Sequence, residues 1–328
     1  MVSRRQFIQT VGSSALAFPA AAISQQAGRV YRLGWIGATA EGFKEPYAEA
    51  FVRRLGELGF AEGRNIVIER RHAGNSIEKL PVAAAELAKL NCDAFFTGGS
   101  EAGLAALTQA SRTTPIVLVA VDFDPVATGD VASLARPGGR VTGVTAIQSE
   151  LPAKRLEILR ELMPRMTKLA VLANEQTAAQ LSLVRGTARR LGLEAHVVDM
   201  KRPPFDFDAA FAEIARNKAD ALNVLGSGFW VPARHRITRM ALEARLPTMF
   251  HHSQWVEAGG LISYGFNFTA MWRRGAEMLA GILRGASPGT MPMEQPTTFE
   301  LVINSATAKA IGVAVPQPFL LRADRVVA

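Results

Sequence analysis

The sequence contains one cysteine in 328 residues, Cys92, so no internal disulfide can form and the fold depends on its apolar core. Three common motifs of nucleotide binding and nucleophilic catalysis are also missing, namely Gly-x-Gly-x-x-Gly, Walker A and Gly-x-Ser-x-Gly. Cys92 has no histidine near it in the sequence, which argues against a thiol nucleophile. These absences leave no catalytic signature and favour a binding protein over an enzyme.

Histidine is scarce, with five residues in the chain. Three of them, His72, His196 and His235, are isolated in the sequence, and we interpret them as surface or packing residues. His251 and His252 are adjacent, so on a strand their side chains would point to opposite faces and would not share a zinc ion. We therefore expect no metal centre and no cofactor.

Clustered charge is also missing. The chain has 37 Lys and Arg against 29 Asp and Glu, a formal charge of +8, but basic pairs such as Arg189-Arg190 are scattered along the predicted helices. Nucleic-acid-binding proteins concentrate basic residues and interleave aromatic ones, so we expect no nucleic-acid partner. A content of 48% hydrophobic and 20% charged residues is typical of a globular protein, and the length predicts more than one core.

The N-terminal residues have the features of an export signal. The pair Arg4-Arg5 precedes Phe7 and a mild apolar run over 11–18, as in twin-arginine signals. The run is too short to span a bilayer, so we expect no stable membrane insertion. Small residues allow cleavage after Ala22 or Ser24, which predicts a signal peptide over 1–24 and a periplasmic mature protein. The alternative is a frayed N-terminal helix.

The stretch from Pro115 to Ala146 organises the prediction of the fold. Residues 116–121 form a continuous apolar run rich in β-branched side chains, which predicts a strand buried on both faces of a parallel sheet. Asp122 and Asp124 follow it, at the strand end where ligands of open α/β sheets bind. The alternative is that these carboxylates lie in a solvated loop and that one of them caps a short helix expected after Pro125.

Strands and helices alternate along the rest of the chain. The first set of strands is predicted at 30–36, 66–69, 93–97, 116–121 and 141–145. An amphipathic helix over 151–163 begins a second set, with strands at 168–172, 194–198, 221–225, 248–250, 261–264 and 299–303 and a long helix over 269–284. This order predicts an α/β protein with two doubly wound parallel-sheet lobes and a ligand cleft between their strand ends.

Four segments carry a family resemblance. They are Leu58-Gly-Phe-Ala-Glu-Gly-Arg-Asn65, Ser133-Leu-Ala-Arg-Pro-Gly-Gly-Arg-Val-Thr-Gly143, Ala258-Gly-Gly-Leu-Ile-Ser-Tyr-Gly265 and Pro296-Thr-Thr-Phe-Glu-Leu-Val-Ile-Asn304. Together and in this order they resemble the exported ABC-transporter substrate-binding proteins related to the tryptophan-binding TrpX type, over nearly the whole mature chain. The resemblance implies a type I periplasmic-binding fold that closes on a small solute and delivers it to a membrane permease driven by an ATPase.

The family pattern also implies how the chain divides. Residues 25–145 plus 266–296 form the N-terminal lobe, and residues 146–265 plus 297–328 form the C-terminal lobe. The helix over 269–284 then packs on the first lobe. The resemblance further implies a monomer without catalytic residues, which binds an amino acid or a related small organic acid or aromatic compound and has the permease and its ATPase as partners.

We expect the ligand-binding residues in polar and Gly-containing loops at the strand ends. They are Thr39, Gly98, Ser100, Asp122 and Asp124 from the first lobe, Asn174, Ser227, Phe229, Ser253 and Tyr264 from the second, and Asn267 at the crossover. Phe229 or the neighbouring Trp230 is a candidate for stacking on a planar ligand. The family commonly has Asp where this chain has Asn267, and the loss of that carboxylate favours a neutral or anionic solute.

Other functions stay open at this point. An exported ligand sensor that partners a membrane receptor would need the same cleft. An exported α/β hydrolase or racemase would turn its solute over instead of binding it stoichiometrically. The ligand domain of a sugar-responsive repressor shares this fold, but it would carry a helix-turn-helix where this chain has an export signal.

Overall fold

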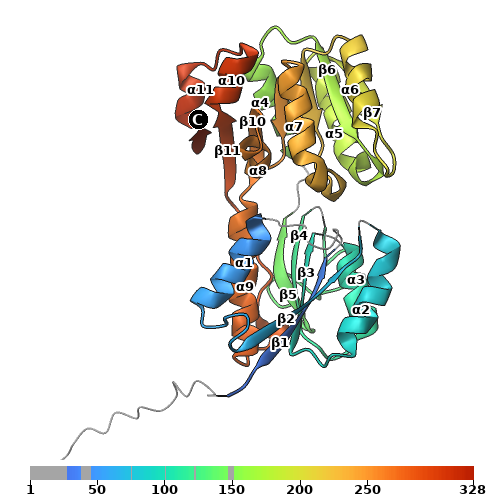
Figure 1. Ribbon diagram of the computed structural model, residues 1–328, viewed down its shortest axis with the longest axis vertical. Coiled ribbons are helices and arrows are strands. Elements are labelled where there is room, and N and C mark those ends of the chain that lie inside the picture. Colours follow the sequence, from blue (N-terminus) through green and yellow to red (C-terminus); the bar gives the residue numbers. More distant parts are fainter. Residues whose placement is uncertain (1–27, 38–45, 75, 100, 122, 147–150) are drawn as a thin grey trace, which may run out of the picture. The chain divides into compact units, whose positions relative to one another are not determined.

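The computed structural model of the protein describes residues 28–37, 46–74, 76–99, 101–121, 123–146 and 151–328. Within these residues the strands form one sheet of five and another of seven, and helices cover both faces of each sheet (Figure 1). The predicted two-lobed α/β fold is confirmed. The predicted signal peptide, residues 1–24, lies outside the described residues, as do Thr39, Ser100 and Asp122.

The first sheet is parallel throughout, as the sequence predicts. Its strands are β1 (Tyr31–Gly37), β2 (Ile66–His72), β3 (Ala94–Gly99), β4 (Ile116–Val121) and β5 (Val141–Ala146). The helices between them are α1 (Pro46–Glu57), α2 (Leu80–Ala88) and α3 (Glu101–Ala110), and a 3₁₀ turn over Ile77–Lys79 precedes α2. The strands lie in the order β2-β1-β3-β4-β5, which is the doubly wound arrangement.

Strand β4 shows why its sequence is apolar without interruption. Successive side chains of a strand point to opposite faces, so Val117 and Val119 join the core under α1, while Leu118 and Ala120 join the core under α2 and α3. Both faces are buried, and a polar residue at any of these positions would lose its hydration without gaining a partner.

Helix α9 (Phe268–Leu283) packs on this first sheet, where the family pattern predicts it, although it comes late in the chain. Figure 1 shows α9 beside α1, on the face of the sheet opposite α2 and α3. Trp272 anchors the helix, because its ring centroid lies 4.7 Å from that of Tyr47, 5.2 Å from that of Phe96 and 5.6 Å from that of Trp35.

The segment after α9 covers the β5 edge of the first sheet. The backbone N–H of Thr145 donates to the carbonyl of Glu294, and the N–H of Glu294 donates to the carbonyl of Gly143, both at 2.9 Å. Gly143 has φ +151°, and a Cβ there would lie 1.9 Å from the carbonyl oxygen of Leu118. The last glycine of the Ser133–Gly143 segment is therefore required by the close approach of β4 and β5.

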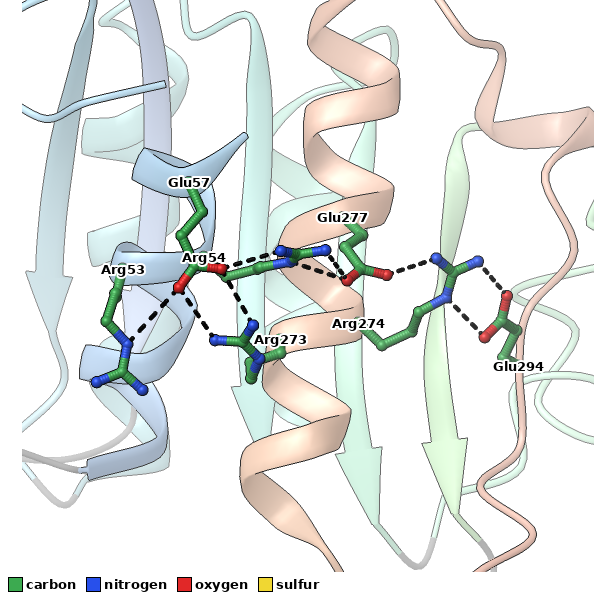
Figure 2. Close-up of polar contacts among 7 residues, drawn as sticks. All are labelled: Arg53, Arg54, Glu57, Arg273, Arg274, Glu277 and Glu294. Atoms are coloured by element: carbon green, nitrogen blue, oxygen red, sulfur yellow. Dashed lines mark hydrogen bonds and ion pairs between the residues drawn. The ribbon is translucent and has the colours of Figure 1, made fainter. Parts of the chain in front are cut away.

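An ion-pair network joins α1, α9 and the segment after α9 (Figure 2). Glu277 is its centre, 2.7 Å from Arg54 on α1 and 2.7 Å from Arg274 on α9. Burial alone would raise the pKa of Glu277, but the hydrogen bonds from Arg274 and Arg54 lower it below its ordinary value. The members of the network are Arg53, Arg54, Glu57, Arg273, Arg274, Glu277 and Glu294. Exposed pairs are weak singly, so the apolar core carries most of the α1–α9 contact.

The second sheet has the order β12-β11-β10-β9-β8-β6-β7. Its strands are β6 (Lys168–Ala173), β7 (Glu194–Asp199), β8 (Ala221–Val224), β9 (Thr248–Phe250), β10 (Ile262–Phe266), β11 (Phe299–Asn304) and β12 (Arg325–Val327). Its helices are α4 (Leu151–Leu162), α5 (Ala178–Arg190), α6 (Phe207–Arg216), α7 (Arg234–Glu243), α8 (Ser253–Glu257), α10 (Ser305–Ile311) and α11 (Gln317–Arg322). Shorter 3₁₀ helices cover Glu175–Thr177 and Gly228–Ala233, and a third, Pro288–Thr290, belongs to the segment after α9 that covers the first sheet.

The second sheet is parallel except at β11, whose antiparallel pairing with β10 the sequence analysis did not anticipate. The chain arrives at β11 after α9 and its following segment, not through a helix that crosses the sheet. A strand entering without such a crossover is free to run in the opposite direction. The sequence analysis also missed β12, a three-residue strand parallel to β11.

Candidate ligand site

Two predicted site residues, Asn174 and Ser227, lie together at the carboxyl ends of neighbouring strands β6 and β8. The side-chain amide of Asn174 donates to the Ser227 hydroxyl at 2.8 Å. Its carbonyl oxygen accepts from the backbone N–H of Gln176, which caps the 3₁₀ helix that follows β6. Both residues are buried, so they form a rigid polar support for this edge of the sheet.

Ser227 is fully engaged in hydrogen bonds. Its hydroxyl accepts from Asn174 and from the N–H of Phe229, and it donates to the side-chain carbonyl of Gln176 at 2.9 Å. One residue earlier, Gly226 exchanges two hydrogen bonds of 2.9 Å with the side-chain amide of Gln180 on α5. These bonds fix the loops after β6 and β8 in one conformation.

The two aromatic candidates after β8 have different surroundings. Trp230 is fully buried and packs against Phe205 and Phe207, so it belongs to the core under α6 and α7. Phe229 is only partly buried, with its ring centroid 6.0 Å from that of Phe205. Of the two, Phe229 is the one with ring surface left for a planar ligand.

Residues near the crossover have structural contacts of their own. The Tyr264 ring stacks on Phe299, and its carbonyl accepts from Arg155 Nε at 2.7 Å. Asn267 is the N-cap of α9, because its Oδ1 accepts from the N–H of Ala270 at 2.8 Å. Ser253 is the partly buried first residue of α8.

Asn267 therefore has a role that its sequence position did not reveal. Besides capping α9, it donates from Nδ2 to Glu300 Oε2 at 3.1 Å. Asp and Asn cap helices about equally well, so the change from the family's usual Asp preserves the cap. The cap by itself accounts for a polar residue at position 267.

In the first sheet, Gly98 lies against the core aromatic residues. A Cβ at this position would lie 2.4 Å from the ring of Trp272, so any larger residue would displace the anchor of α9. The glycine at the end of β3 is explained by this contact without a ligand.

Asp124 lies in an exposed turn, and the short helix predicted after Pro125 is absent from the described residues 123–146. Asp124 Oδ1 accepts from the N–H groups of Val126 and Ala127, at 3.0 and 3.1 Å. Asp commonly closes turns in this way, and the local bonds replace those of a helix. Asp124 thus caps a turn, and no helix follows it.

His251 and His252, which the sequence analysis considered only as a metal pair, follow β9 at the same edge of the sheet. The expectation that they point to opposite faces is wrong, because they lie in a bend after the strand and their ring centroids are 4.5 Å apart. Both are nearly buried, at 6% and 3% exposure. Their position directly after the predicted strand 248–250 was the sequence feature that could have made them candidates. The part of the chain that the structure describes contains no group of three potential metal ligands.

The two imidazoles are uncharged at neutral pH. Burial, followed by the positive charges of Arg155 and Arg234, lowers the pKa of His252 to about 3. Burial is the largest cause that places the pKa of His251 well below its ordinary value, and repulsion from a protonated His252 and from Arg155 lowers it further. Arg155 comes from α4, where it is itself buried.

Among the described residues, no helix combines the length and the apolar character that a membrane span requires. Most of the predicted residues that the structure describes lie at or just after the carboxyl ends of strands, namely Gly98, Asp124, Asn174, Ser227, Phe229, Ser253 and Asn267, whereas Tyr264 lies in the middle of β10. Among these residues, the side chains of Asn174 and Ser227 are hydrogen-bonded to each other.

Comparison with known proteins gives a consistent result. The family model described as "ABC transporter substrate binding protein" matches residues 46–327. The "Tyrosine-binding protein" of Clostridioides difficile (strain R20291) is 25% identical over 266 residues, which cover 80% of this chain and 75% of that protein.

Solved structures share the fold. A conserved domain protein from Vibrio cholerae superposes with a TM-score of 0.77 at 24% identity, over 91% of this chain and 100% of the other. An ABC domain in complex with L-Trp from Streptococcus pneumonia superposes with a TM-score of 0.75 at 18% identity, again over 91% and 100%.

Proposed function

The chain belongs to the ABC transporter substrate-binding protein family, and from this we propose that it is the exported solute-binding protein of an ABC importer. The match of the family model to residues 46–327 carries the proposal. The solute is a small organic molecule, namely an amino acid or a related small organic acid or aromatic compound, bound between the lobes at the strand ends. Its partners are a membrane permease and the ATPase that drives it.

Aromatic amino acids are the first ligands to test. One relative is named a tyrosine-binding protein, and a structural neighbour contains L-Trp. The partly exposed ring of Phe229 supports a planar ligand, and the carboxylate of Asp124 supports an ammonium group. The fixed polar loops of Asn174 and Ser227 support a preorganised site, which lowers the entropy cost of binding.

Binding acts by population shift. We assign residues 25–145 plus 266–296 to one lobe and residues 146–265 plus 297–328 to the other. A ligand that touches both lobes stabilises the closed form relative to the open form. Two or three charge-assisted hydrogen bonds of roughly 1.5–3 kcal/mol each outweigh a gap of a few kcal/mol between the two forms.

Replacing Asp124 with Asn separates binding from structure. Asn keeps the turn cap but removes the charge, so the melting temperature of the unliganded protein should barely change. Affinity for an amino acid should fall about tenfold or more, because a charge-assisted bond of roughly 1.5–3 kcal/mol is lost. Titration calorimetry and a thermal melt on the same preparation measure both. Unchanged affinity would remove Asp124 from the site, and a large loss of unliganded stability would make its role structural.

Export depends on Arg4 and Arg5 in this proposal. Changing both to Lys should leave uncleaved precursor in the cytoplasm, because the twin-arginine pathway reads the arginine pair. Cell fractionation with an immunoblot for precursor and mature forms measures the outcome. Normal processing and delivery of the double variant would contradict the twin-arginine assignment.

Native mass spectrometry tests the proposed function without assuming a ligand. The protein, purified from the periplasm without refolding, should carry a small molecule in one-to-one ratio, and tandem dissociation identifies it. A thermal-shift panel of the twenty amino acids should then raise the melting temperature for the same compound. A protein that carries no solute and shows no shift with any amino acid would contradict the proposal.

A further inference from the structure

Several buried polar atoms around α8 have no hydrogen-bond partner within the part of the chain that the structure describes. They are Nδ1 of His251, Nδ1 of His252, Oε1 of Gln254 and Nε1 of Trp255. Leaving such an atom unpaired destabilises the folded protein, because the atom loses its hydration without gaining a hydrogen bond. Four of them on neighbouring residues form a concentration that the packing of a core does not require.

His252 lies beside Phe268, where the chain passes from the second sheet to the first. It follows β9 of the second sheet, and its ring centroid is 4.7 Å from that of Phe268. Phe268 is the first residue of α9, which packs on the first sheet. In the proposed function the solute binds between the lobes at strand ends, and His252 follows such a strand end and contacts the first residue of α9.

The electrostatic surroundings of His252 are positive. Arg155 on α4, Arg234 at the start of α7 and the neighbouring His251 are the titratable groups that face it, while Phe268 on α9 and Trp255 on α8 are uncharged. A neutral imidazole can donate one N–H, and the indole of Trp255 donates another. Donors in a positive field suit an anion such as a carboxylate.

We propose that the imidazole of His252, whose buried Nδ1 has no partner among the described residues, binds the carboxylate of the solute, and that it is a specificity-determining residue of the ligand site. This inference rests on the proposed function and names the end of the solute that the second lobe recognises. Gln254 Oε1 is then an acceptor beside the carboxylate, available to the ammonium group of the same solute. The histidine pair is thus retained for recognition, which explains why its polar atoms are buried without internal partners.

Two substitutions of His252 and one control test this. His252→Phe keeps an aromatic ring against Phe268 but removes both ring nitrogens. His252→Asn places an amide N–H near the position of Nδ1. His235→Phe changes an exposed histidine of α7 and serves as the control.

The probes are L-tyrosine and L-tyrosine amide, with L-tryptophan and its amide as a second pair, titrated by calorimetry. Wild type and His235→Phe should bind the free acid at least tenfold more tightly than the amide. His252→Phe should lose at least tenfold in affinity for the acid and most of this discrimination, and His252→Asn should keep most of both. The unliganded melting temperature of His252→Phe should equal or exceed that of the wild type, because removing an unpaired buried polar group is not destabilising.

Unchanged discrimination between acid and amide in His252→Phe would overturn the inference. A clear fall in its unliganded melting temperature would also overturn it, by showing that the imidazole serves the fold. Failure of the wild type to bind any of the four probes would count against the proposed aromatic amino acid ligand. Even if the wild type binds no probe, the unliganded melting temperature of His252→Phe still tests whether the imidazole serves the fold. Failure of the proposed ligand and failure of the inference about His252 are therefore distinguishable.

Discussion

A fragment of residues 25–146 should fail to fold cooperatively, although it contains every strand of the first sheet. The fragment lacks α9, whose buried residues include Trp272, Leu279 and Ile282. Burying each such side chain contributes about 1.5–3 kcal/mol. The buried residues of α9 with large apolar side chains are Met271, Trp272, Met278, Leu279, Ile282 and Leu283. Their loss approaches the whole stability of a typical domain, roughly 5–15 kcal/mol. The exposed face should make the fragment bind a hydrophobic dye.

Supplying α9 should restore folding. Residues 267–296 joined to the fragment by a flexible linker also return the Glu277 ion pairs and the Glu294 backbone pairing with β5. The same fusion with Trp272→Ala is the matched control and should melt at a clearly lower temperature, because truncating a buried Trp costs about 3–5 kcal/mol. Circular dichroism melts and dye binding measure the three proteins. A soluble 25–146 fragment with a sharp melt would show instead that α9 is dispensable for the first sheet.

Acidification from pH 8 to pH 5 should lower the free energy of unfolding by about 2 kcal/mol through His252 alone. Its pKa is about 3 in the folded protein and has the ordinary histidine value, near 6.5, after unfolding. Between these values the unfolded chain binds a proton that the folded chain does not. Stability is therefore full above pH 6.5 and falls as the pH falls toward 3. His251 acts in the same direction, because its pKa is lowered too.

Urea denaturation at several pH values measures this dependence. The slope of the unfolding free energy against pH gives the number of protons that the unfolded chain binds in excess of the folded chain. Between pH 4 and pH 6 this number should be about one smaller in His252→Asn than in the wild type. His235 is exposed, and the His235→Asn variant should keep the wild-type slope. An unfolding free energy that is the same at pH 8 and pH 5 would contradict the buried, uncharged state of the pair. An unchanged slope in His252→Asn would assign the acid sensitivity to other groups.

The sequence predicted elements that depend on local patterns. The unbroken apolar run of 116–121 predicted β4 correctly, because a strand buried on both faces has no polar position. The direction of β11 was not predictable in this way. An apolar strand has the same composition in either direction, and the direction depends on where the preceding helix delivers the chain.

The sequence located the strand ends that carry the candidate residues, but not the contacts that these residues make there. Strand ends were identified, and Asn174 and Ser227 meet there as neighbouring strands require. Asn267 and Asp124 have structural hydrogen bonds that no sequence spacing reveals, because the partners are backbone N–H groups set by the local fold. His252 was passed over because its burial beside Arg155 arises from segments far apart in the chain.

Titration calorimetry with L-tyrosine and L-tryptophan tests the central claim most directly. The mature protein, dialysed extensively to remove retained solute, should bind at least one of them in saturable one-to-one stoichiometry. Chromatography after the titration should recover that amino acid unchanged, as expected for a carrier rather than an enzyme. Absence of saturable binding for both, together with no shift in the amino acid panel, would contradict the account, and so would conversion of the bound compound.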